Sequence, residues 1–132
     1  MTRTTFSVET DSWLTTVDVT DRLADAVPDD LESGTLTAFV KHTTAGLLVQ
    51  ESEPRLRGDI ESFLRDLVPD EGHAHDQLDG NADSHLRAAL VGPDVTIPVE
   101  NGELVLGTWQ SVLLLECDGP RTRTVTVTTV GE

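Results

Sequence analysis

Apolar and polar residues alternate in two blocks of this chain, one before residue 51 and one after residue 94. A period of two is typical of β-strands that bury one face. In the first block it predicts strands at 4–9, 13–19, 35–41 and 47–50. In the second block it predicts strands at 95–99, 103–106, 109–117 and 122–130, with turns at 100–102 and 118–120. Asn101-Gly102 and Gly119-Pro120 are typical of hairpin turns, so the sheet should be largely antiparallel.

The middle of the chain has helical spacing instead. Pro54 is favoured in a first helical turn, and the apolar residues after it fall on one stripe: Leu56, Ile60, Phe63, Leu64 and Leu67. A second, shorter helix is predicted from residue 83 or 84 to 91, with Asn81, Asp83 or Ser84 as its cap and Gly92-Pro93 as its end. A minor helix is predicted at 21–27, capped by Thr20.

Strands on both sides of two central helices indicate an α+β fold. We therefore predict a single compact domain over residues 1–132, a largely antiparallel β-sheet or sandwich with two central helices packed on it.

Acidic residues give the chain a strong negative charge. Asp and Glu number 24 against 9 Lys and Arg, for a formal charge of −15, and Lys41 is the single lysine. No basic stripe is present, so we do not expect nucleic acid as a partner. A carboxylate-rich surface almost without lysine favours a halophilic protein, because molar salt screens self-repulsion within about 3 Å.

Neither end of the chain suggests a membrane or export. The first residues lack the apolar run of a signal peptide, and no segment is apolar enough to span a bilayer, so we expect a cytoplasmic protein without membrane partners. Cys117 is the single cysteine and follows an apolar strand. It is expected to be a packed small hydrophobe rather than a nucleophile.

Histidine is scarce, yet three of the four histidines have contexts suited to presenting an imidazole: His42, His75 and His85. Small residues follow His42, and His85 shares a helix face with Ala88 and Ala89. The three rings could hold a catalytic metal ion with one open position, or they could be unrelated strand-end, loop and helix residues. His73 could take the place of His75.

Other polar residues are candidates for a site. Asp59 borders the stripe of the first central helix, where its carboxylate could reach a cleft or remain in solvent. Glu116 interrupts the apolar run 112–115, so it either faces outward or is paired in a polar pocket. Gly107-Thr108-Trp109-Gln110 offers hydrogen-bonding groups beside an indole that could equally belong to the core. No nucleotide-binding loop or nucleophile elbow is present.

Four segments, read together, resemble the successive motifs of the YjbQ-like family, described as secondary thiamine-phosphate synthases. They are His42-Thr43-Thr44-Ala45-Gly46, the run from Leu78-Asp79-Gly80-Asn81 to Leu90, Thr96-Ile97-Pro98-Val99, and Leu106-Gly107-Thr108-Trp109-Gln110. The likeness covers about residues 35–132, while residues 1–34 fit only in length and strand pattern. His73 departs from it, since the family usually has an aromatic residue there.

The resemblance implies a homotrimer with a histidine pocket that holds a divalent metal, for which we expect zinc, with nickel, cobalt or iron as other options. His42, His75 and His85 would be the metal ligands. The implied reaction joins hydroxymethylpyrimidine diphosphate to a thiazole phosphate. The expected catalytic residues are Glu116, Asp59 and Gln110, and the expected substrate-binding residues are Thr43, Thr44, Asn81, Arg87 and Thr108.

Three functions are compatible with the sequence. The chain could be this metal-assisted synthase, a transferase. It could be a metal-dependent hydrolase or another small-molecule enzyme that uses the same site. It could also be a non-catalytic trimeric protein that binds a small phosphorylated ligand.

Overall fold

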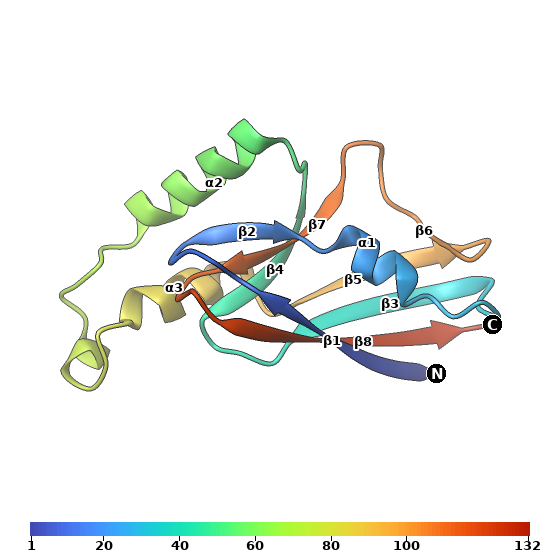
Figure 1. Ribbon diagram of the computed structural model, residues 1–132, viewed down its shortest axis with the longest axis horizontal. Helices are drawn as coiled ribbons and strands as arrows, with labels where there is room; N and C mark the ends of the chain where they lie inside the picture. Colours follow the sequence, from blue (N-terminus) through green and yellow to red (C-terminus); the bar gives the residue numbers. More distant parts are fainter.

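The computed structural model describes residues 1–132, and its eight strands form two antiparallel sheets (Figure 1). The larger sheet has the order β1-β8-β3-β5-β6, with bounds Thr2–Glu9, Thr122–Gly131, Ser33–Val40, Asp94–Glu100 and Glu103–Leu104. The smaller sheet has the order β2-β7-β4, with bounds Thr15–Asp18, Ser111–Glu116 and Ala45–Gln50. The predicted α+β fold with antiparallel sheets is confirmed.

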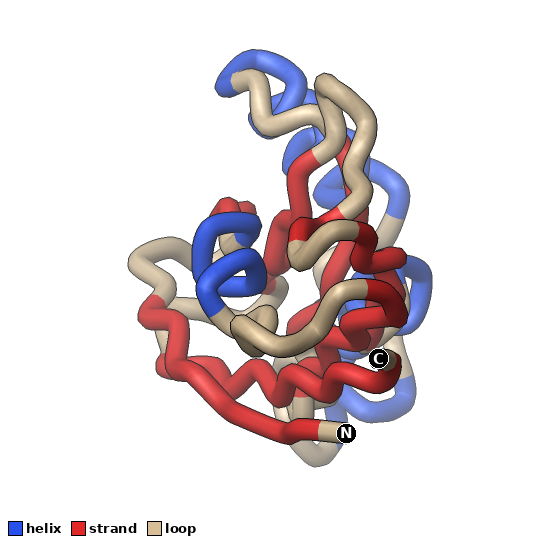
Figure 2. The backbone as a smooth tube through the Cα atoms, turned by 90° about the vertical axis from the view of Figure 1, so that its right-hand side faces the viewer, coloured by secondary structure: helices blue, strands red, loops and turns tan.

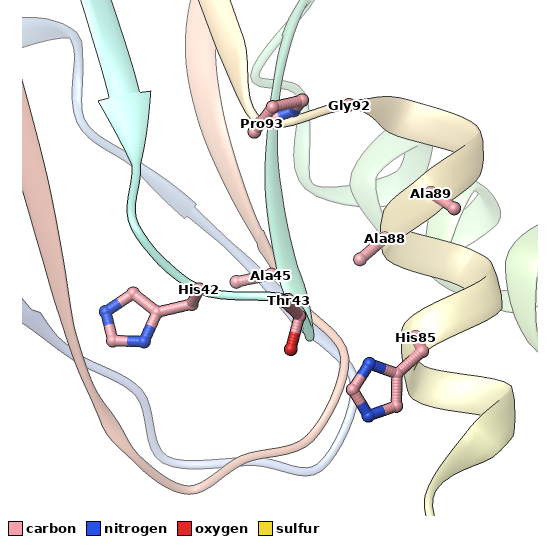
Figure 3. Close-up of a pocket in the computed structure, with 8 residues that line it drawn as sticks. All are labelled: His42, Thr43, Ala45, His85, Ala88, Ala89, Gly92 and Pro93. Atoms are coloured by element: carbon pink, nitrogen blue, oxygen red, sulfur yellow. The ribbon is translucent and has the colours of Figure 1, made fainter. Parts of the chain in front are cut away.

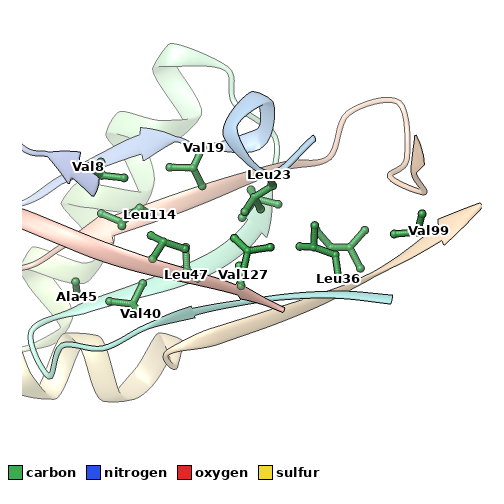
Figure 4. Close-up of a cluster of buried hydrophobic side chains, with 14 of the residues drawn as sticks. Val8, Val19, Leu23, Leu36, Val40, Ala45, Leu47, Val99, Leu114 and Val127 are labelled. Atoms are coloured by element: carbon green, nitrogen blue, oxygen red, sulfur yellow. The ribbon is translucent and has the colours of Figure 1, made fainter. Parts of the chain in front are cut away.

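Apolar side chains from both sheets meet between them and form the main core (Figure 4). On β3, Leu36, Ala38 and Val40 alternate into this core. On β7, every residue from Val112 to Glu116 is buried, because Val112 and Leu114 face the core while Leu115 packs in a second cluster beneath the helices. The second cluster includes Leu64 and Ala88 from those helices. The smaller sheet therefore lies between the larger sheet and the helices.

Four helical segments complete the chain: α1 (Thr20–Asp25), α2 (Pro54–Leu67), the short 3₁₀ helix η1 (Ala74–Gln77) and α3 (Ala82–Val91). The two central helices were predicted, but η1 was not. The two central helices α2 and α3 lie between the strands before residue 51 and those after residue 93. Figure 2 shows all helices in blue and all strands in red. None of these helices has the length and apolar run that crossing a lipid bilayer would require.

Two helix details differ from the prediction. Thr20 does not cap α1, because the Asp18 carboxylate accepts its backbone N–H at 2.9 Å and the Thr20 hydroxyl instead accepts the N–H of Val112. On α2, the predicted apolar stripe is covered only in part: Leu64 is buried, whereas Phe63 and Leu67 are exposed. The reason is that α2 lies along the edge strand β2, so only part of its apolar stripe is covered.

Two strands also end at residues other than those predicted. The strand predicted at 109–117 begins only at Ser111, and the one predicted at 103–106 ends at Leu104. Residues 105–110 between them form a loop that projects at the top of the view in Figure 1, on the same side as α2. Trp109 is 73% exposed in this loop, so it is not a core residue. Gly92 has a φ of 94° at the end of α3, as the predicted helix stop requires.

Candidate functional site

A hollow of about 350 Å³ lies between α3 and the connection from β3 to β4 (Figure 3). Its lining consists mostly of small residues with two imidazoles: His42, Thr43, Ala45, His85, Ala88, Ala89, Gly92 and Pro93. The helix can approach β4 closely because Gly46 has no side chain, and a Cβ there would lie 2.7 Å from the Gly92 carbonyl oxygen. The N–H of Leu47 donates to the same oxygen at 3.1 Å, which fixes the end of α3 over the strand.

Thr43 and His85 face each other across this hollow, whereas His42 points away from His85 (Figure 3). The backbone N–H of Thr124 on β8 donates to Nε2 of His42 at 3.0 Å, so the ring proton must be on Nδ1 when His42 is neutral. Burial and the positive charge of Arg123 lower the pKa of His42, although the Glu116 carboxylate opposes this shift. His42 is therefore a neutral, fixed side chain at the edge of the hollow.

A second hollow of about 590 Å³ shares His85 with the first and lies towards η1. Here the rings of His75 and His85 meet edge to face, with centroids 5.0 Å apart and an interplanar angle of 85°. Nε2 of His75 is buried and has no hydrogen-bond partner. The nearest carboxylate oxygen, on Asp79, is 3.8 Å away. An unpartnered buried nitrogen is costly to leave unsatisfied.

His73 has a different role from His75. Its Nε2 lies 2.8 Å from the Pro69 carbonyl oxygen, and its backbone N–H donates to Asp76 at 3.1 Å, at the start of η1. His73 therefore holds the segment between α2 and α3 in place. Of the two alternatives left open by the sequence, His75 is the residue whose ring meets His85.

The three predicted metal ligands do not converge in one copy of the chain. His42 points towards β8, whereas the His75 ring meets the His85 ring. No group of three His, Cys, Asp or Glu side chains is placed to hold a metal ion. A catalytic zinc site needs three protein ligands around one point, so the residues of a single chain do not fit the implied metal.

Glu116 is completely buried and forms an ion pair with Arg123 on β8. Both of its carboxylate oxygens are used: Thr10 donates to one at 2.8 Å, the Asp118 N–H donates to the other at 2.8 Å, and Arg123 donates to both. Burial acts to raise the pKa of Glu116, but the hydrogen bonds from Arg123, Asp118 and Thr10 outweigh it and hold that pKa below its usual value. Glu116 is thus turned inward and paired, and it cannot contact a substrate in the hollow.

Thr44 belongs to the same buried group. Its hydroxyl and its carbonyl oxygen both accept hydrogen bonds from Arg123, at 2.9 and 3.1 Å. The neighbouring Thr43 is exposed and lines the hollow, so of the two threonines predicted to bind substrate only Thr43 presents its hydroxyl there. Arg123 therefore anchors the segment that presents Thr43.

Arg87 is also fully buried, which excludes it as a donor to substrate phosphate. Its guanidinium donates to the carbonyl oxygens of Leu64, Arg65 and Val68 at the end of α2. It also pairs with the carboxylates of Asp83 and Asp70. These bonds satisfy the last carbonyls of α2 and fasten α2 to α3, so Arg87 holds the helix that presents His85.

The remaining predicted residues lie away from the hollow. Asp59 is exposed on α2, and Asn81 donates to Asp118 at 3.1 Å while its own Oδ1 is buried without a partner. Thr108 and Gln110 are exposed in the 105–110 loop. In the pairing of β4 with β7, Ser111 is opposite Gln50 and Glu116 is opposite Ala45, so the loop lies five residues, roughly 17 Å, from the hollow.

The buried ion pair of Arg123 and the buried position of Arg87 were not predicted from the sequence. The signal for Arg123 was present, because Arg123, Val125 and Val127 alternate with polar residues on β8 and must share its inward face. Cys117 is buried as predicted, and burial together with the Glu116 charge raises the pKa of its thiol to about 12. This thiol does not ionise near neutral pH and is not a nucleophile.

Comparison with known proteins gives consistent matches along the chain. Residues 4–132 match the family model described as UPF0047 protein YjbQ-like. A UPF0047 protein of Archaeoglobus fulgidus is 47% identical over 112 residues, which are 84% of this chain and 87% of that protein. A UPF0047 protein of Methanothermobacter thermautotrophicus is 42% identical over 118 residues, 88% of this chain and 82% of that protein.

Solved structures agree with the fold. The crystal structure of a hypothetical protein from Aeropyrum pernix K1 superimposes with a TM-score of 0.96 and 41% identity, covering 100% of both chains. A YbjQ-like protein of unknown function from Sulfolobus solfataricus P2 has a TM-score of 0.96 and 35% identity, covering 99% of this chain and 97% of that one.

Proposed function

This chain belongs to the UPF0047 YjbQ-like family, and we propose that it is an enzyme that binds a small phosphorylated substrate between Thr43 and His85. The observation that supports this most is that the Thr43 hydroxyl faces the His85 imidazole across an open hollow. The adjoining hollow is lined by the side chain of His75 as well. Hydroxyl and imidazole groups donate to phosphate oxygens, and the two volumes fall in the usual range for ligand pockets.

The reaction we propose is the coupling of hydroxymethylpyrimidine diphosphate to a thiazole phosphate. The carbon–oxygen bond between the pyrimidine methylene and the diphosphate breaks, and the electron pair leaves with the diphosphate. The lone pair of the thiazole ring nitrogen then forms the new carbon–nitrogen bond, so the step needs no oxidant or reductant. The main demand on the protein is stabilisation of the charge that develops on the leaving group.

Residues of the chain itself can meet that demand. His85 and Thr43 would donate to the leaving diphosphate, and His75 would donate from the adjoining hollow. His42 would act from the edge through Nδ1–H, because Nε2 is occupied by the Thr124 N–H. Glu116, Arg123 and Arg87 are positioning residues, since they hold the segments beneath the site without reaching it.

The charge of the chain bears on substrate access. Both substrates are anions and the chain has a formal charge of −15, so the protein field slows their encounter at low ionic strength. In molar salt the Debye length falls to about 3 Å and this repulsion is screened. We therefore expect the proposed activity to be higher in molar salt than in dilute buffer.

The test measures three products in molar KCl from one incubation with both substrates: thiamine phosphate, diphosphate and orthophosphate. Thr43→Val removes the hydroxyl but keeps the shape of the side chain. Thr37→Val on β3 is the matched control, because Thr37 bonds only to Thr96 on the larger sheet. We expect thiamine phosphate from the wild type and from Thr37→Val, with a loss of about 10²-fold in Thr43→Val.

Other outcomes separate the alternatives. Orthophosphate without thiamine phosphate would favour a hydrolase at the same site. Binding of the diphosphate without turnover would favour a ligand-binding protein. Equal turnover by Thr43→Val and Thr37→Val would contradict the proposed site. Metal analysis of the active protein would show whether side chains from different copies together bind a metal ion, since those of a single chain are not placed to do so.

We also propose that the protein acts as a homotrimer, as the resemblance implies. Large apolar side chains on α2, α3 and the 105–110 loop are exposed in the single chain, which favours association.

A further inference from the structure

Exposed large apolar side chains are concentrated in two places. Leu67 on α2 and Leu86 and Leu90 on α3 line one hollow, and Phe63 lies one helical turn before Leu67. The exposures of these four side chains are between 43% and 62%. The second place is the 105–110 loop, where Val105 and Trp109 are exposed. Because soluble monomers rarely leave such side chains together in solvent, both places are candidates for contact surfaces.

The helix surface has a hollow that could receive a side chain. It measures about 400 Å³ and is lined by Leu67, Val68, Pro69, His73, Leu86, Ala89 and Leu90. It adjoins both hollows of the candidate site, because Ala89 also lines the first, and His73 and Leu86 also line the second. We call this hollow the α2–α3 socket. No acidic side chain lines it.

The 105–110 loop has the complementary character. No charged residue occurs from Leu104 to Leu115. The loop is closed on itself, because the N–H of Gly107 donates to the Gln110 side chain at 2.8 Å and the N–H of Gln110 donates back to the Gly107 carbonyl at 3.0 Å. This turn fixes the backbone on either side of Trp109, and an indole has only two side-chain torsions to immobilise, so it binds at low entropic cost.

The negative charge of the chain limits which surfaces of a second copy can contact the socket. Two copies of a chain with formal charge −15 repel each other over most of their surfaces. Contact between copies is therefore easiest where both surfaces lack carboxylates, as the socket and the loop do. In its own chain the loop lies roughly 17 Å along β7 from the first hollow, which the socket adjoins, so it does not fill the socket of its own chain.

We infer that the 105–110 loop of one copy docks with Trp109 in the α2–α3 socket of a second copy. Such a contact joins two different surfaces, so it is head-to-tail. When each copy makes the same contact with the next, the copies form a closed ring if the rotation from one copy to the next divides a full turn. Docking would bring Thr108 and Gln110 of one copy beside His85 of the next, and the site would be shared between copies. This last part rests on the proposed function, whereas the docking itself does not.

The first experiment measures mass by sedimentation velocity in molar KCl. We expect the wild type to be an oligomer at tens of micromolar, and Trp109→Ala and Leu90→Glu to sediment as folded monomers with unchanged circular dichroism. Phe39→Ala is the matched control, because Phe39 is an exposed aromatic residue on β3, away from both surfaces. A monomeric wild type, or an oligomer that Trp109→Ala leaves intact, would overturn the docking.

The second experiment tests the orientation of the contact. Val105→Cys and Leu90→Cys chains are mixed and treated with a flexible bismaleimide, while buried Cys117 stays unreactive. We expect cross-linked dimers from the mixture and none from either variant separately. Cross-linking of Val105→Cys to itself would overturn the pairing of two different surfaces.

The third experiment tests the shared site. His85→Ala and Gln110→Ala chains are refolded together at equal amounts, and about a quarter of the interfaces then combine an intact His85 with an intact Gln110. We expect about a quarter of the wild-type activity to return from two inactive variants. No recovery from an assembled mixture would overturn the shared site, and a wild type that assembles without any turnover would instead contradict the proposed function.

Discussion

The imidazole rings of His75 and His85 lie edge to face, with centroids 5.0 Å apart, and Nε2 of His75 is buried there without a partner. His75 reaches this position from η1 and His85 from the first turn of α3. A buried nitrogen without a partner is a cost to the folded chain that a bound ligand would remove. The pair therefore serves either ligand binding or the packing of η1 against α3.

Replacement of His75 by Phe separates these two explanations. Phe keeps a ring edge against His85 but removes the orphaned nitrogen. We expect the free energy of unfolding of His75→Phe to stay within about 1 kcal/mol of wild type, while affinity for diphosphate falls about tenfold. Urea unfolding and calorimetric titration measure the two quantities. A loss of several kcal/mol of stability with unchanged affinity would assign His75 a purely structural role.

Arg87 should be among the residues most important for stability. Arg87→Met leaves the buried Asp83 carboxylate and the last carbonyls of α2 without their donor. Removal of one partner from a buried ion pair costs about 3–5 kcal/mol, so urea unfolding of Arg87→Met should show a loss of this size. Arg55→Met is the control, because Arg55 is 93% exposed beside Glu53 and its loss should cost about 1 kcal/mol or less.

His42 should make stability depend on pH. Because burial and Arg123 lower its folded pKa, the unfolded chain binds the proton more readily. The stability contributed by neutral His42 is therefore complete above about pH 6.5, the unfolded value, and is lost as the pH falls from there through the folded pKa. Protonation would also break the bond from the Thr124 N–H.

The measurement is an NMR titration of the four histidines together with unfolding at pH 7.5 and 5.5. We expect the His42 ring to titrate below the ordinary histidine range, and His42→Gln to lose less stability than wild type between these two pH values. A His42 signal that titrates at or above 6.5 would contradict this assignment.

Salt should stabilise the folded chain through screening. With a formal charge of −15, carboxylates repel one another across the surface in dilute buffer. We expect the Tm to rise with KCl and to level off near 1 M, where the Debye length is about 3 Å. Sucrose of equal osmolality contains no ions and should have a smaller effect. Full stability in dilute buffer would contradict adaptation to concentrated salt.

Much of the fold was predictable because it depends on local periodicity. Alternation predicted the strands at 35–41 and 122–130, which the structure contains as β3 and β8, and the Gly92 stop of α3 was also correct. The apolar stripe of α2 misled the prediction, because periodicity indicates which residues share a face but not whether another element covers that face. Phe63 is apolar, periodic and exposed.

The candidate site was predictable only in part. Residue type and local context were enough to select His85 and Thr43. Whether a polar side chain faces a hollow or is buried in an ion pair depends on contacts between residues far apart in the sequence. Glu116 is paired with Arg123, and Arg87 with Asp83 and Asp70, through folding that brings separate segments together. The same contacts removed Glu116 and Arg87 from the set of residues that can touch a substrate.

The proposed site is tested most directly by the rates at which His85→Ala and His73→Ala form thiamine phosphate in molar KCl. Both variants lose an imidazole, but only His85 faces Thr43, while the His73 ring is bound to the Pro69 carbonyl. We expect a loss of about 10²-fold or more in His85→Ala and a loss of only a few-fold in His73→Ala. Equal rates for His85→Ala and wild type, with folding and assembly intact, would contradict the proposed site.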